Sequence, residues 1–295
     1  MPSRIRTAVF PIAGLGTRFL PVTKSVPKEM LPLIDRPLIQ YAIDEARAAG
    51  ITDFVFVTAR GKGALEDYFD AAPELARELR ERGKDDLLAD LDSAALPPAA
   101  VASVRQQEAL GLGHAVWCAR RLVGDEPFAV VLPDDVITAA EPCLAQMVEA
   151  HAEAGEGASI LAAMEVPREQ IRSYGALEIA GEDGRLIRAT DLVEKPAPED
   201  APSSYAVIGR YILSPSVMQR LGSIGEGAGG EIQLTDAIAA EARAGAPVYG
   251  YRFRGRRYDC GSKLGYLQAT VAFALARDDL SAEFAAHLKE VARGL

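Results

Sequence analysis

Short apolar runs alternate with amphipathic segments along the first half of the chain. Runs rich in β-branched and aromatic residues predict strands at 7–12, 53–59, 101–105, 128–133 and 158–165. Apolar residues at helical spacing predict helices near 38–49, 112–121 and 141–154. Because strands and helices alternate, the pattern predicts a largely parallel sheet with helices on both faces.

The pattern changes after Val166. Two runs of alternating polarity flank a Gly-Glu-Asp-Gly turn at 181–184, and together they predict a β-hairpin within 174–196. Further strands are predicted at 205–214 and 247–255, with a helix closed by glycine at 232–245. The sheet is therefore expected to become mixed in this half of the chain.

The segment 263–295 has a helical pattern of apolar residues, at Leu267, Val271, Ala274, Phe284, Leu288 and Val291. This pattern predicts a helical extension that packs on another subunit, so we expect a homodimer or homotetramer. With no internal repeat and no low-complexity linker, the rest of the chain, 1–262, is expected to form one domain. A charge-rich run at 74–94 is interpreted as a solvated helical excursion.

Composition excludes several classes of protein. The chain has 295 residues, a net charge of -10, 49% hydrophobic residues and 25% charged residues, which is typical of a globular protein. The acidic balance argues against nucleic acids and anionic membranes as partners, since both favour broad basic surfaces. No leader pattern and no membrane-spanning apolar run is seen, so a cytoplasmic location is expected. The three cysteines are dispersed and indicate buried free thiols rather than disulfides or a zinc site.

The stretch from Val9 to Leu33 concentrates glycine and positive charge, with no acidic residue before Glu29. Glycines let backbone N–H groups approach a phosphate closely. Arg18 supplies a planar fork of donors and Lys28 a point charge, and both suit a polyphosphate. The stretch therefore predicts a local binding site for a small anion.

Two familiar phosphate-binding motifs do not fit this chain. Gly14-Leu15-Gly16 follows a predicted strand, but Phe19 stands where the dinucleotide-binding fingerprint needs its third glycine. The sequence "RGKG" at 60–63 lacks the glycine spacing of a P-loop. Neither a dinucleotide-binding fingerprint nor a P-loop is therefore predicted.

The segment "PIAGLGTRFLPVTKSVPKEMLPL" resembles the signature of the sugar-1-phosphate nucleotidyltransferases. Further segments are similar, in order and over nearly the whole chain, to the bacterial uridylyltransferases of this family: "VRQQEALGLGHAV", "VVLPDDV", "LVEKP", "GRYIL", "IQLTDAI" and "YDCGSKLGY". The resemblance implies a Rossmann-like three-layer α/β/α fold with a mixed, mostly parallel central sheet, and Mg²⁺ as cofactor. It also implies that UDP-glucose and pyrophosphate are formed from UTP and glucose 1-phosphate.

On this resemblance, Arg18 binds the triphosphate and Lys28 the phosphates around the reacting centre. Lys24 is either a further phosphate contact or, as we favour, a solvated loop lysine. The residues expected at the nucleotide are Ala13, Gly14, Gly16, Glu29, Gln106 and Gly111. Gln106 carries a donor and an acceptor on one amide, which suits the N3–H and carbonyl edge of uracil.

Asp134 and Asp135 follow a buried apolar strand, at the edge where open α/β sheets bind ligands. Carboxylate oxygens suit Mg²⁺, and Asp134 is expected to bind it, with Asp259 as a second ligand by analogy with related enzymes. The same resemblance implies that the residues at the sugar phosphate are Asp135, Gly175, Glu194 and Lys195. Glu194 would accept hydrogen bonds from glucose hydroxyls, and Lys195 would bind the phosphate.

The implied reaction joins two anions, so it needs charge cancellation and alignment but no protein nucleophile. The residues expected to carry the chemistry are Arg18, Lys28 and Asp134. A glucose-1-phosphate thymidylyltransferase, or another sugar-nucleotide pyrophosphorylase, would use the same phosphate machinery and remains an alternative. A non-catalytic sensor of nucleotide sugars is the alternative of another class, and the intact set of charged residues argues against it.

Overall fold

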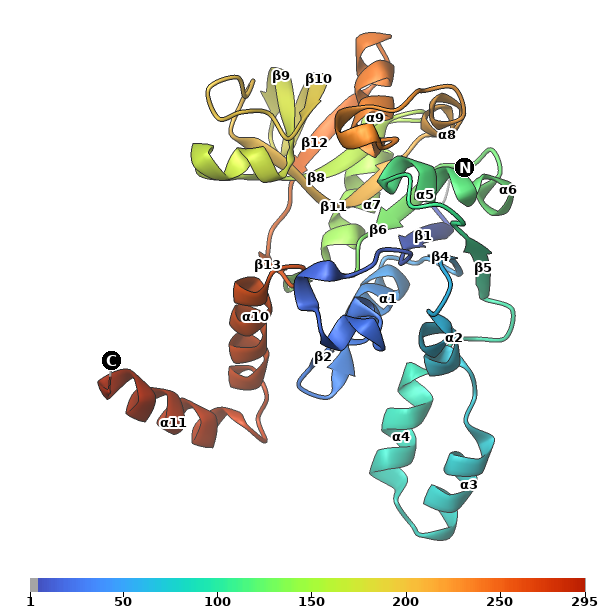
Figure 1. The fold of residues 1–295 in the computed structure, drawn as a ribbon, viewed down its shortest axis with the longest axis vertical. Helices are drawn as coiled ribbons and strands as arrows, with labels where there is room; N and C mark the ends of the chain where they lie inside the picture. The colour runs from blue at the N-terminus through green and yellow to red at the C-terminus, as the bar shows by residue number, and fades with distance from the viewer. Residues whose placement is uncertain (1–4, 295) are drawn as a thin grey trace.

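A mixed nine-stranded sheet forms the centre of the molecule within the described residues, 5–294 (Figure 1). The computed structural model orders its strands as β5 (Val101–Arg105), β4 (Asp53–Thr58), β1 (Thr7–Pro11), β6 (Phe128–Val131), β11 (Tyr205–Leu213), β8 (Ser159–Glu165), β12 (Val248–Arg252), β10 (Leu186–Glu194) and β9 (Gly175–Asp183). Residues 1–4 of the predicted domain and residue 295 of the predicted extension lie outside the described part.

In the central sheet, the strands of the first half of the chain pair mainly in parallel, and antiparallel pairing enters with the strands after Val166, where the sequence pattern changes. Neighbouring strands in the series β5, β4, β1 and β6 pair in parallel, as do β8 and β12. Strand β11 is antiparallel to β6 and β8, and β10 is antiparallel to β12 and β9. The predicted strands and the hairpin are present, and the sheet is mixed as expected. Among its described strands, four parallel pairings accompany five antiparallel ones, so the expected predominance of parallel pairing is not found, because β11 lies between β6 and β8 and the β9–β10 hairpin joins the edge.

Helices cover both faces of the sheet. One face packs against α5 (Leu112–Cys118), α6 (Arg120–Val123), α8 (Pro215–Leu221) and α9 (Leu234–Arg243). The other face packs against α1 (Leu38–Ala48), α2 (Gly63–Phe69) and α7 (Cys143–Ala154). Successive residues of β1 belong to opposite cores, since Val9 joins the first and Phe10 the second. The result is a three-layer α/β/α arrangement.

A smaller group of elements gathers beside the ends of β1 and β6. Strands β7 (Asp135–Thr138) and β13 (Arg256–Asp259) form an antiparallel ribbon in which Asp135 lies opposite Asp259. A third core joins this ribbon to α10 (Lys263–Leu275) and to the short hairpin of β2 (Pro32–Leu33) and β3 (Arg36–Pro37). The 3-10 turns after β1 are η1 (Thr17–Phe19), η2 (Val22–Lys24) and η3 (Lys28–Met30).

Two parts project from this body (Figure 1). Helices α3 (Pro73–Glu81) and α4 (Asp85–Ala94) form one projection, and Ala76 is its only buried helical residue, which confirms the predicted solvated excursion. Helix α11 (Ser281–Arg293) forms the other, and none of its residues is buried. The remaining 3-10 turns are η4 (Arg168–Ser173) and η5 (Ala228–Gly230).

Some predicted boundaries were wrong. The strand predicted at 247–255 ends at Arg252, because Gly255 has a positive φ of 149° and turns the chain into β13. In the predicted hairpin, Gly181 belongs to β9, and the turn between Asp183 and Leu186 places Gly184 at a φ of 57°.

Two predicted helices are interrupted. The helix predicted near 112–121 is divided into α5 and α6. The C-terminal pattern is divided at 276–280, where Asp278 and Asp279 are poor helix formers and Arg277 is held by Asp35 and Asp279.

The three cysteines are free, as predicted, with Cys143 and Cys260 buried and Cys118 half-buried. Burial raises the pKa of the Cys260 thiol to about 12. Across residues 5–294, no helix has the length and apolar character needed to cross a bilayer.

Candidate active site

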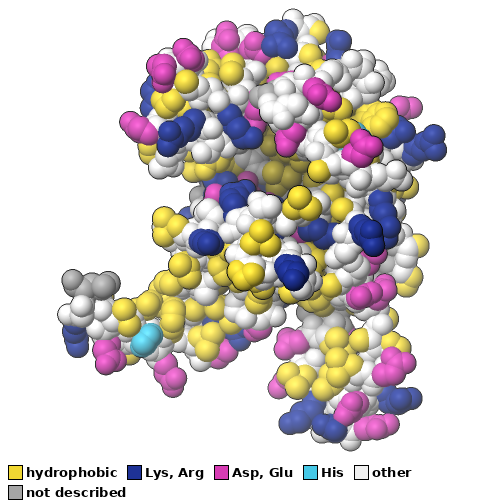
Figure 2. Space-filling view, viewed as in Figure 1, with side chains coloured by type: hydrophobic (Ala, Val, Ile, Leu, Met, Phe, Trp, Pro, Cys, Tyr) yellow, Lys and Arg dark blue, Asp and Glu magenta, His cyan; other side chains and the backbone are white. Residues whose placement is uncertain are grey.

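A cleft of about 450 Å³ lies between the β7–β13 ribbon and the β9–β10 hairpin. It is lined by predicted site residues that are far apart in the sequence: Arg18, Asp134, Asp135, Gly175, Glu194 and Asp259. The surface is visibly hollowed between the lobe that carries β9 and β10 and the rest of the molecule (Figure 2). The fold thus collects charged groups from both halves of the chain in one place.

Lys28 and Asp134 form an ion pair beside this cleft. The Nζ atom of Lys28 donates to Oδ2 of Asp134 at 2.6 Å, and both side chains are mostly buried. Burial favours the neutral form of each group, but the attraction between them outweighs it. The pKa of Asp134 is held below its ordinary value, and the pKa of Lys28 is raised. Both groups are therefore charged at neutral pH.

A glycine leaves open the space between Asp134 and Asp259. A Cβ atom at Gly261 would lie 2.7 Å from Oδ2 of Asp134, 3.0 Å from Oδ1 of Asp259 and 3.4 Å from Nη2 of Arg18. The two carboxylates thus border one small space, next to a guanidinium. Hard oxygen donors of this kind fit Mg²⁺, which takes few protein carboxylates and fills its shell with water and phosphate oxygens. Within 5–294, no cluster of three or more potential His, Cys, Asp or Glu ligands occurs.

The glycine turn after β1 holds Arg18 and Lys28 near each other. Gly16 has a φ of 65°, and a Cβ atom there would lie 3.2 Å from Cβ of Lys28 and from Cγ2 of Thr23. The Thr23 hydroxyl donates to the Gly16 carbonyl at 2.8 Å and closes the turn. Lys24 is exposed and does not line the cleft, as expected of a solvated loop lysine.

Gln106 and Gly111 meet through a direct hydrogen bond. Nε2 of Gln106 donates to the Gly111 carbonyl at 3.0 Å and lies 3.1 Å from Nδ1 of His114. Gly111 has a φ of 97°, and a Cβ atom there would lie 2.7 Å from Cβ of Glu231. Only glycine fits this position. His114 was not predicted as a site residue, although it lies in the "GLGHA" motif.

Ala13 and Gly14 lie in the loop after β1, with Gly14 exposed and Ala13 half-buried. Glu29 is fully buried, and Lys62 donates to its Oε2 at 2.9 Å. Burial raises the pKa of Glu29, against the opposing effect of Lys62 and Lys28. Lys62 belongs to the "RGKG" segment and was missed as a site residue. In this conformation Glu29 presents no surface to a nucleotide, so its predicted contact stays a prediction.

The buried ion pair of Lys62 and Glu29 is expected to stabilise the folded protein. Lys62→Met leaves a buried carboxylate without its cation, so the free energy of unfolding should fall by about 3 kcal/mol, a typical cost of breaking such a pair. Chemical denaturation measures this change. Adding Glu29→Gln should restore much of the loss, and Lys84→Met, at an exposed lysine, is the control. A loss equal to that of the control would contradict the role of the pair.

The predicted sugar-side residues come together at the end of the β9–β10 hairpin. Gly175 lies opposite Glu194 in the ladder, and the Thr235 hydroxyl donates to Oε2 of Glu194 at 2.7 Å. Lys195 has a positive φ of 47°, and its Nζ lies 3.3 Å from Oε1 of Glu194. Thr235, in the "IQLTDAI" motif, was not predicted individually.

Asp135 has protein partners for both carboxylate oxygens. Arg257 donates to Oδ1 through Nε at 2.6 Å, and the Gly209 N–H donates to Oδ2 at 2.8 Å. The carboxylate lines the cleft but is held by these groups, so its predicted contact with the sugar phosphate stays a prediction. Arg257 was missed, because nothing in the local sequence connects it to Asp135.

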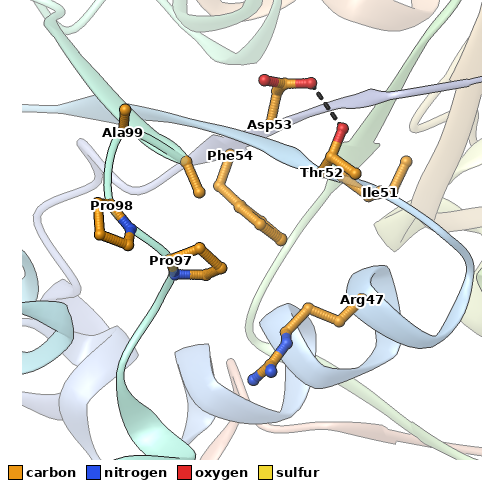
Figure 3. A pocket seen from close by; sticks show the side chains of 9 residues that line it. Arg47, Ile51, Thr52, Asp53, Phe54, Pro97, Pro98 and Ala99 are labelled. Atoms are coloured by element: carbon orange, nitrogen blue, oxygen red, sulfur yellow. Dashed lines mark hydrogen bonds between the residues drawn. The ribbon is translucent and has the colours of Figure 1, made fainter.

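A second cavity of about 450 Å³ has a different character (Figure 3). It lies where α1 ends and β4 begins, opposite the loop 97–100, and Phe54 and Pro97 contribute to its largely apolar wall. Arg47 points toward it from α1. Because it lacks the convergent charges of the first cleft, it does not fit a pair of phosphorylated substrates.

Comparison with known proteins agrees with these features. The family model described as nucleotidyl transferase matches residues 9–274. A UTP-glucose-1-phosphate uridylyltransferase from Komagataeibacter xylinus is 50% identical over 260 residues, which are 88% of this chain and 90% of the relative. A structure of UDP-glucose pyrophosphorylase complexed with UDP-glucose has a TM-score of 0.82 and 41% identity, covering 92% of this chain and 100% of that chain. The UTP-bound UGPase from Acinetobacter baumannii has a TM-score of 0.87 and 41% identity. The match covers 97% of this chain and 99% of that chain.

Proposed function

Since this chain belongs to the nucleotidyl transferase family, we propose that it forms UDP-glucose and pyrophosphate from UTP and glucose 1-phosphate. The observation that carries the proposal is the composition of one cleft. Arg18 and a pair of carboxylates, Asp134 and Asp259, line one side. Glu194, the last residue of the hairpin and the partner of Lys195, lines the other. Such a site suits one nucleoside triphosphate and one sugar phosphate.

The chemistry is an in-line attack by a phosphate oxygen of glucose 1-phosphate on the α-phosphorus of UTP. A bond forms between that oxygen and the phosphorus, and the bond to the leaving pyrophosphate breaks. Arg18 and Lys28 lower the repulsion between the two anions and stabilise charge on the leaving group. Because its pKa is raised despite burial, Lys28 keeps its charge at neutral pH.

We propose Mg²⁺ as the cofactor, held by Asp134 and Asp259 around the space that Gly261 leaves open. When bound, Mg²⁺ supplies positive charge to phosphate oxygens and orients them. Asp134 also anchors Lys28, so one carboxylate serves both the cation site and the phosphate site. This shared position fixes the distance between the two sources of positive charge.

The base is read by Gln106, whose amide is oriented by its neighbours. Its Nε2 faces the Gly111 carbonyl and Nδ1 of His114, which leaves Oε1 to accept a hydrogen bond from N3–H of uracil. Cytosine has no hydrogen on N3, so this contact discriminates against CTP. Thymine keeps that hydrogen, and the contact therefore does not separate UTP from dTTP.

The sugar phosphate is positioned by the hairpin residues. Glu194 accepts from glucose hydroxyls with Thr235 steadying its carboxylate, and Lys195 contributes a cation to the phosphate. Gly175 keeps the wall free of a side chain: a Cβ atom there would lie 3.4 Å from Oε2 of Glu194.

A panel of substrates tests the proposed function. Pyrophosphate release is measured with UTP, dTTP, CTP and ATP, each combined with glucose 1-phosphate and with other sugar 1-phosphates. UTP with glucose 1-phosphate should give the highest kcat/KM. A preference for dTTP would favour the thymidylyltransferase alternative, and no turnover with any pair would favour the nucleotide-sugar sensor.

We also propose a homodimer or homotetramer, assembled through the C-terminal extension. Leu264 and Leu267 of α10 are 67% and 60% exposed, and α11 buries none of its residues. The arm that carries apolar side chains projects from the body (Figure 2). An uncovered apolar arm of this kind is typical of subunit contacts.

Light scattering at micromolar concentration tests the assembly. A mass of at least twice 31.4 kDa is expected, and Leu267→Glu should lower it because a charge would replace exposed apolar surface. Leu87→Glu, at a leucine that is 53% exposed on α4, is the matched control. A monomeric mass for the parent protein would refute the proposal.

A further inference from the structure

Arg257 connects the two sides of the cleft. It lies in β13, two residues before Asp259, and its side chain is only 9% exposed. Its partners come from different elements, because Asp135 begins β7 and Tyr174 directly precedes β9. Arg257, Asp135 and Tyr174 all line the cleft.

One end of this connection is rigid. Arg257 donates to Oδ1 of Asp135 through Nε at 2.6 Å, and its Nη2 lies 2.5 Å from the same oxygen in an ion pair. The other oxygen of Asp135 accepts from the Gly209 N–H, and a Cβ atom at Gly209 would lie only 2.6 Å from it. Because the carboxylate is enclosed in this way, the guanidinium has a fixed anchor beside the proposed Mg²⁺ ligands.

The other end reaches the sugar side. Nη1 of Arg257 donates to the Tyr174 hydroxyl at 2.8 Å, and its Cζ lies 5.1 Å from the centre of the Tyr174 ring. The Tyr174 carbonyl accepts from the N–H of Lys195 at 2.9 Å, and Gly175 is the next residue in the chain. Hydrogen bonds at the side chain and at the backbone of Tyr174 therefore connect Arg257, and through it Asp135, to the backbone of Lys195.

We propose that Arg257 is a positioning residue for the sugar-phosphate side, acting through the hydroxyl of Tyr174. The inference rests on the proposed function, because it concerns where glucose 1-phosphate binds relative to UTP. The Lys195 side chain is 55% exposed, and Glu194 is its only partner among the described ion pairs. Because few contacts hold the side chain, the position of its ammonium group depends on a fixed backbone at Lys195. The hydrogen bond from Arg257 to Tyr174 supplies a link between that backbone and the reacting centre.

A positioning role for Arg257 predicts weaker use of glucose 1-phosphate with unchanged binding of UTP. Tyr174→Phe removes one hydroxyl and keeps the ring, so the KM for glucose 1-phosphate should rise about tenfold, the factor expected for a hydrogen bond to a charged group. The Kd for UTP, measured by calorimetry without sugar phosphate, should stay within about twofold. Arg257→Lys keeps a positive charge beside Asp135 but loses the planar guanidinium. The same rise in the KM for glucose 1-phosphate, with an unchanged Kd for UTP, is expected.

Two further variants sharpen the test. The double variant Tyr174→Phe with Arg257→Lys should lose no more than the more severe single variant, because both substitutions remove the same link. Tyr205→Phe is the matched control: its hydroxyl accepts from Nη1 of Arg252 at 3.3 Å on the same sheet, outside the cleft. This control should retain the parent values for both substrates. Calorimetric titration with UDP-glucose measures binding independently of turnover. Tyr174→Phe should raise the Kd for UDP-glucose about tenfold.

The outcomes separate the inference from the proposed function. If the parent forms UDP-glucose and Tyr174→Phe matches Tyr205→Phe for both substrates, the positioning role is wrong while the proposed function stands. If Tyr174→Phe weakens UTP and glucose 1-phosphate equally and lowers the melting temperature, Arg257 has a structural role only. If the parent neither forms UDP-glucose nor binds it, the proposed function fails and the inference fails with it.

Discussion

Asp134→Asn is expected to lower kcat/KM for UDP-glucose formation by at least about a thousandfold. The substitution removes the negative charge that borders the proposed cation site and holds Lys28 at 2.6 Å. Metal-ion stabilisation of a transferring phosphoryl group is worth several kcal/mol, and each 1.36 kcal/mol is a factor of ten in rate. Asparagine keeps the shape and an acceptor oxygen for Lys28, so the loss reports charge rather than collapse of the site.

Steady-state kinetics over a range of Mg²⁺ concentrations measures this effect. The apparent affinity for Mg²⁺ should fall together with kcat, while the circular dichroism spectrum matches that of the parent. Asp85→Asn, at an exposed aspartate of α4, controls for the loss of one carboxylate and should behave as the parent does. Near-normal turnover of Asp134→Asn at ordinary Mg²⁺ would reject the assignment.

The second large effect distinguishes the two halves of the substrate site. Lys195→Ala should raise the KM for glucose 1-phosphate far more than the KM for UTP, because it removes a cation from the sugar phosphate. Arg18→Ala should instead weaken the use of UTP and the reverse reaction with pyrophosphate. Each change is expected to cost about 10²–10³-fold in kcat/KM, as does the loss of one charge-stabilising donor in other enzymes.

Binding titrations decide between the two assignments once thermal melting shows that both variants fold. Lys24→Ala is the control, because Lys24 is an exposed lysine in the same loop as Arg18 and does not line the cleft. If Lys195→Ala binds UDP-glucose as well as the parent does but loses affinity for UTP, the two halves have been assigned in reverse.

The sequence predicted the parts of the fold that depend on local patterns. The strands of the central sheet are short apolar runs whose successive residues face different helical layers, as Val9 and Phe10 do, so periodicity and burial agree. The β7–β13 ribbon was missed, because it pairs two four-residue segments that lie more than a hundred positions apart. Backbone conformation at Gly255 separates β12 from β13, and an apolar pattern does not report it.

The candidate site, like the fold, was predicted from the sequence only in part. Arg18, Lys28 and Asp134 lie within dense motifs and were predicted as site residues. The structure places Arg18 and Asp134 beside Gly261 and pairs Lys28 with Asp134. Lys62 and Arg257 were missed because their roles come only from contacts across the fold, with Glu29 and with Asp135. Local sequence indicates the groups that we propose to contact substrates more readily than the groups that hold them in place.

The most direct test of the account follows labelled phosphorus through a single turnover. The purified protein is incubated with Mg²⁺, glucose 1-phosphate and UTP that carries ³²P at either the α or the γ position, and the products are separated. Attack on the α-phosphorus predicts that the α label appears in UDP-glucose and the γ label in pyrophosphate. Label from the γ position in inorganic phosphate, with no labelled UDP-glucose from the α position, would contradict the proposed reaction.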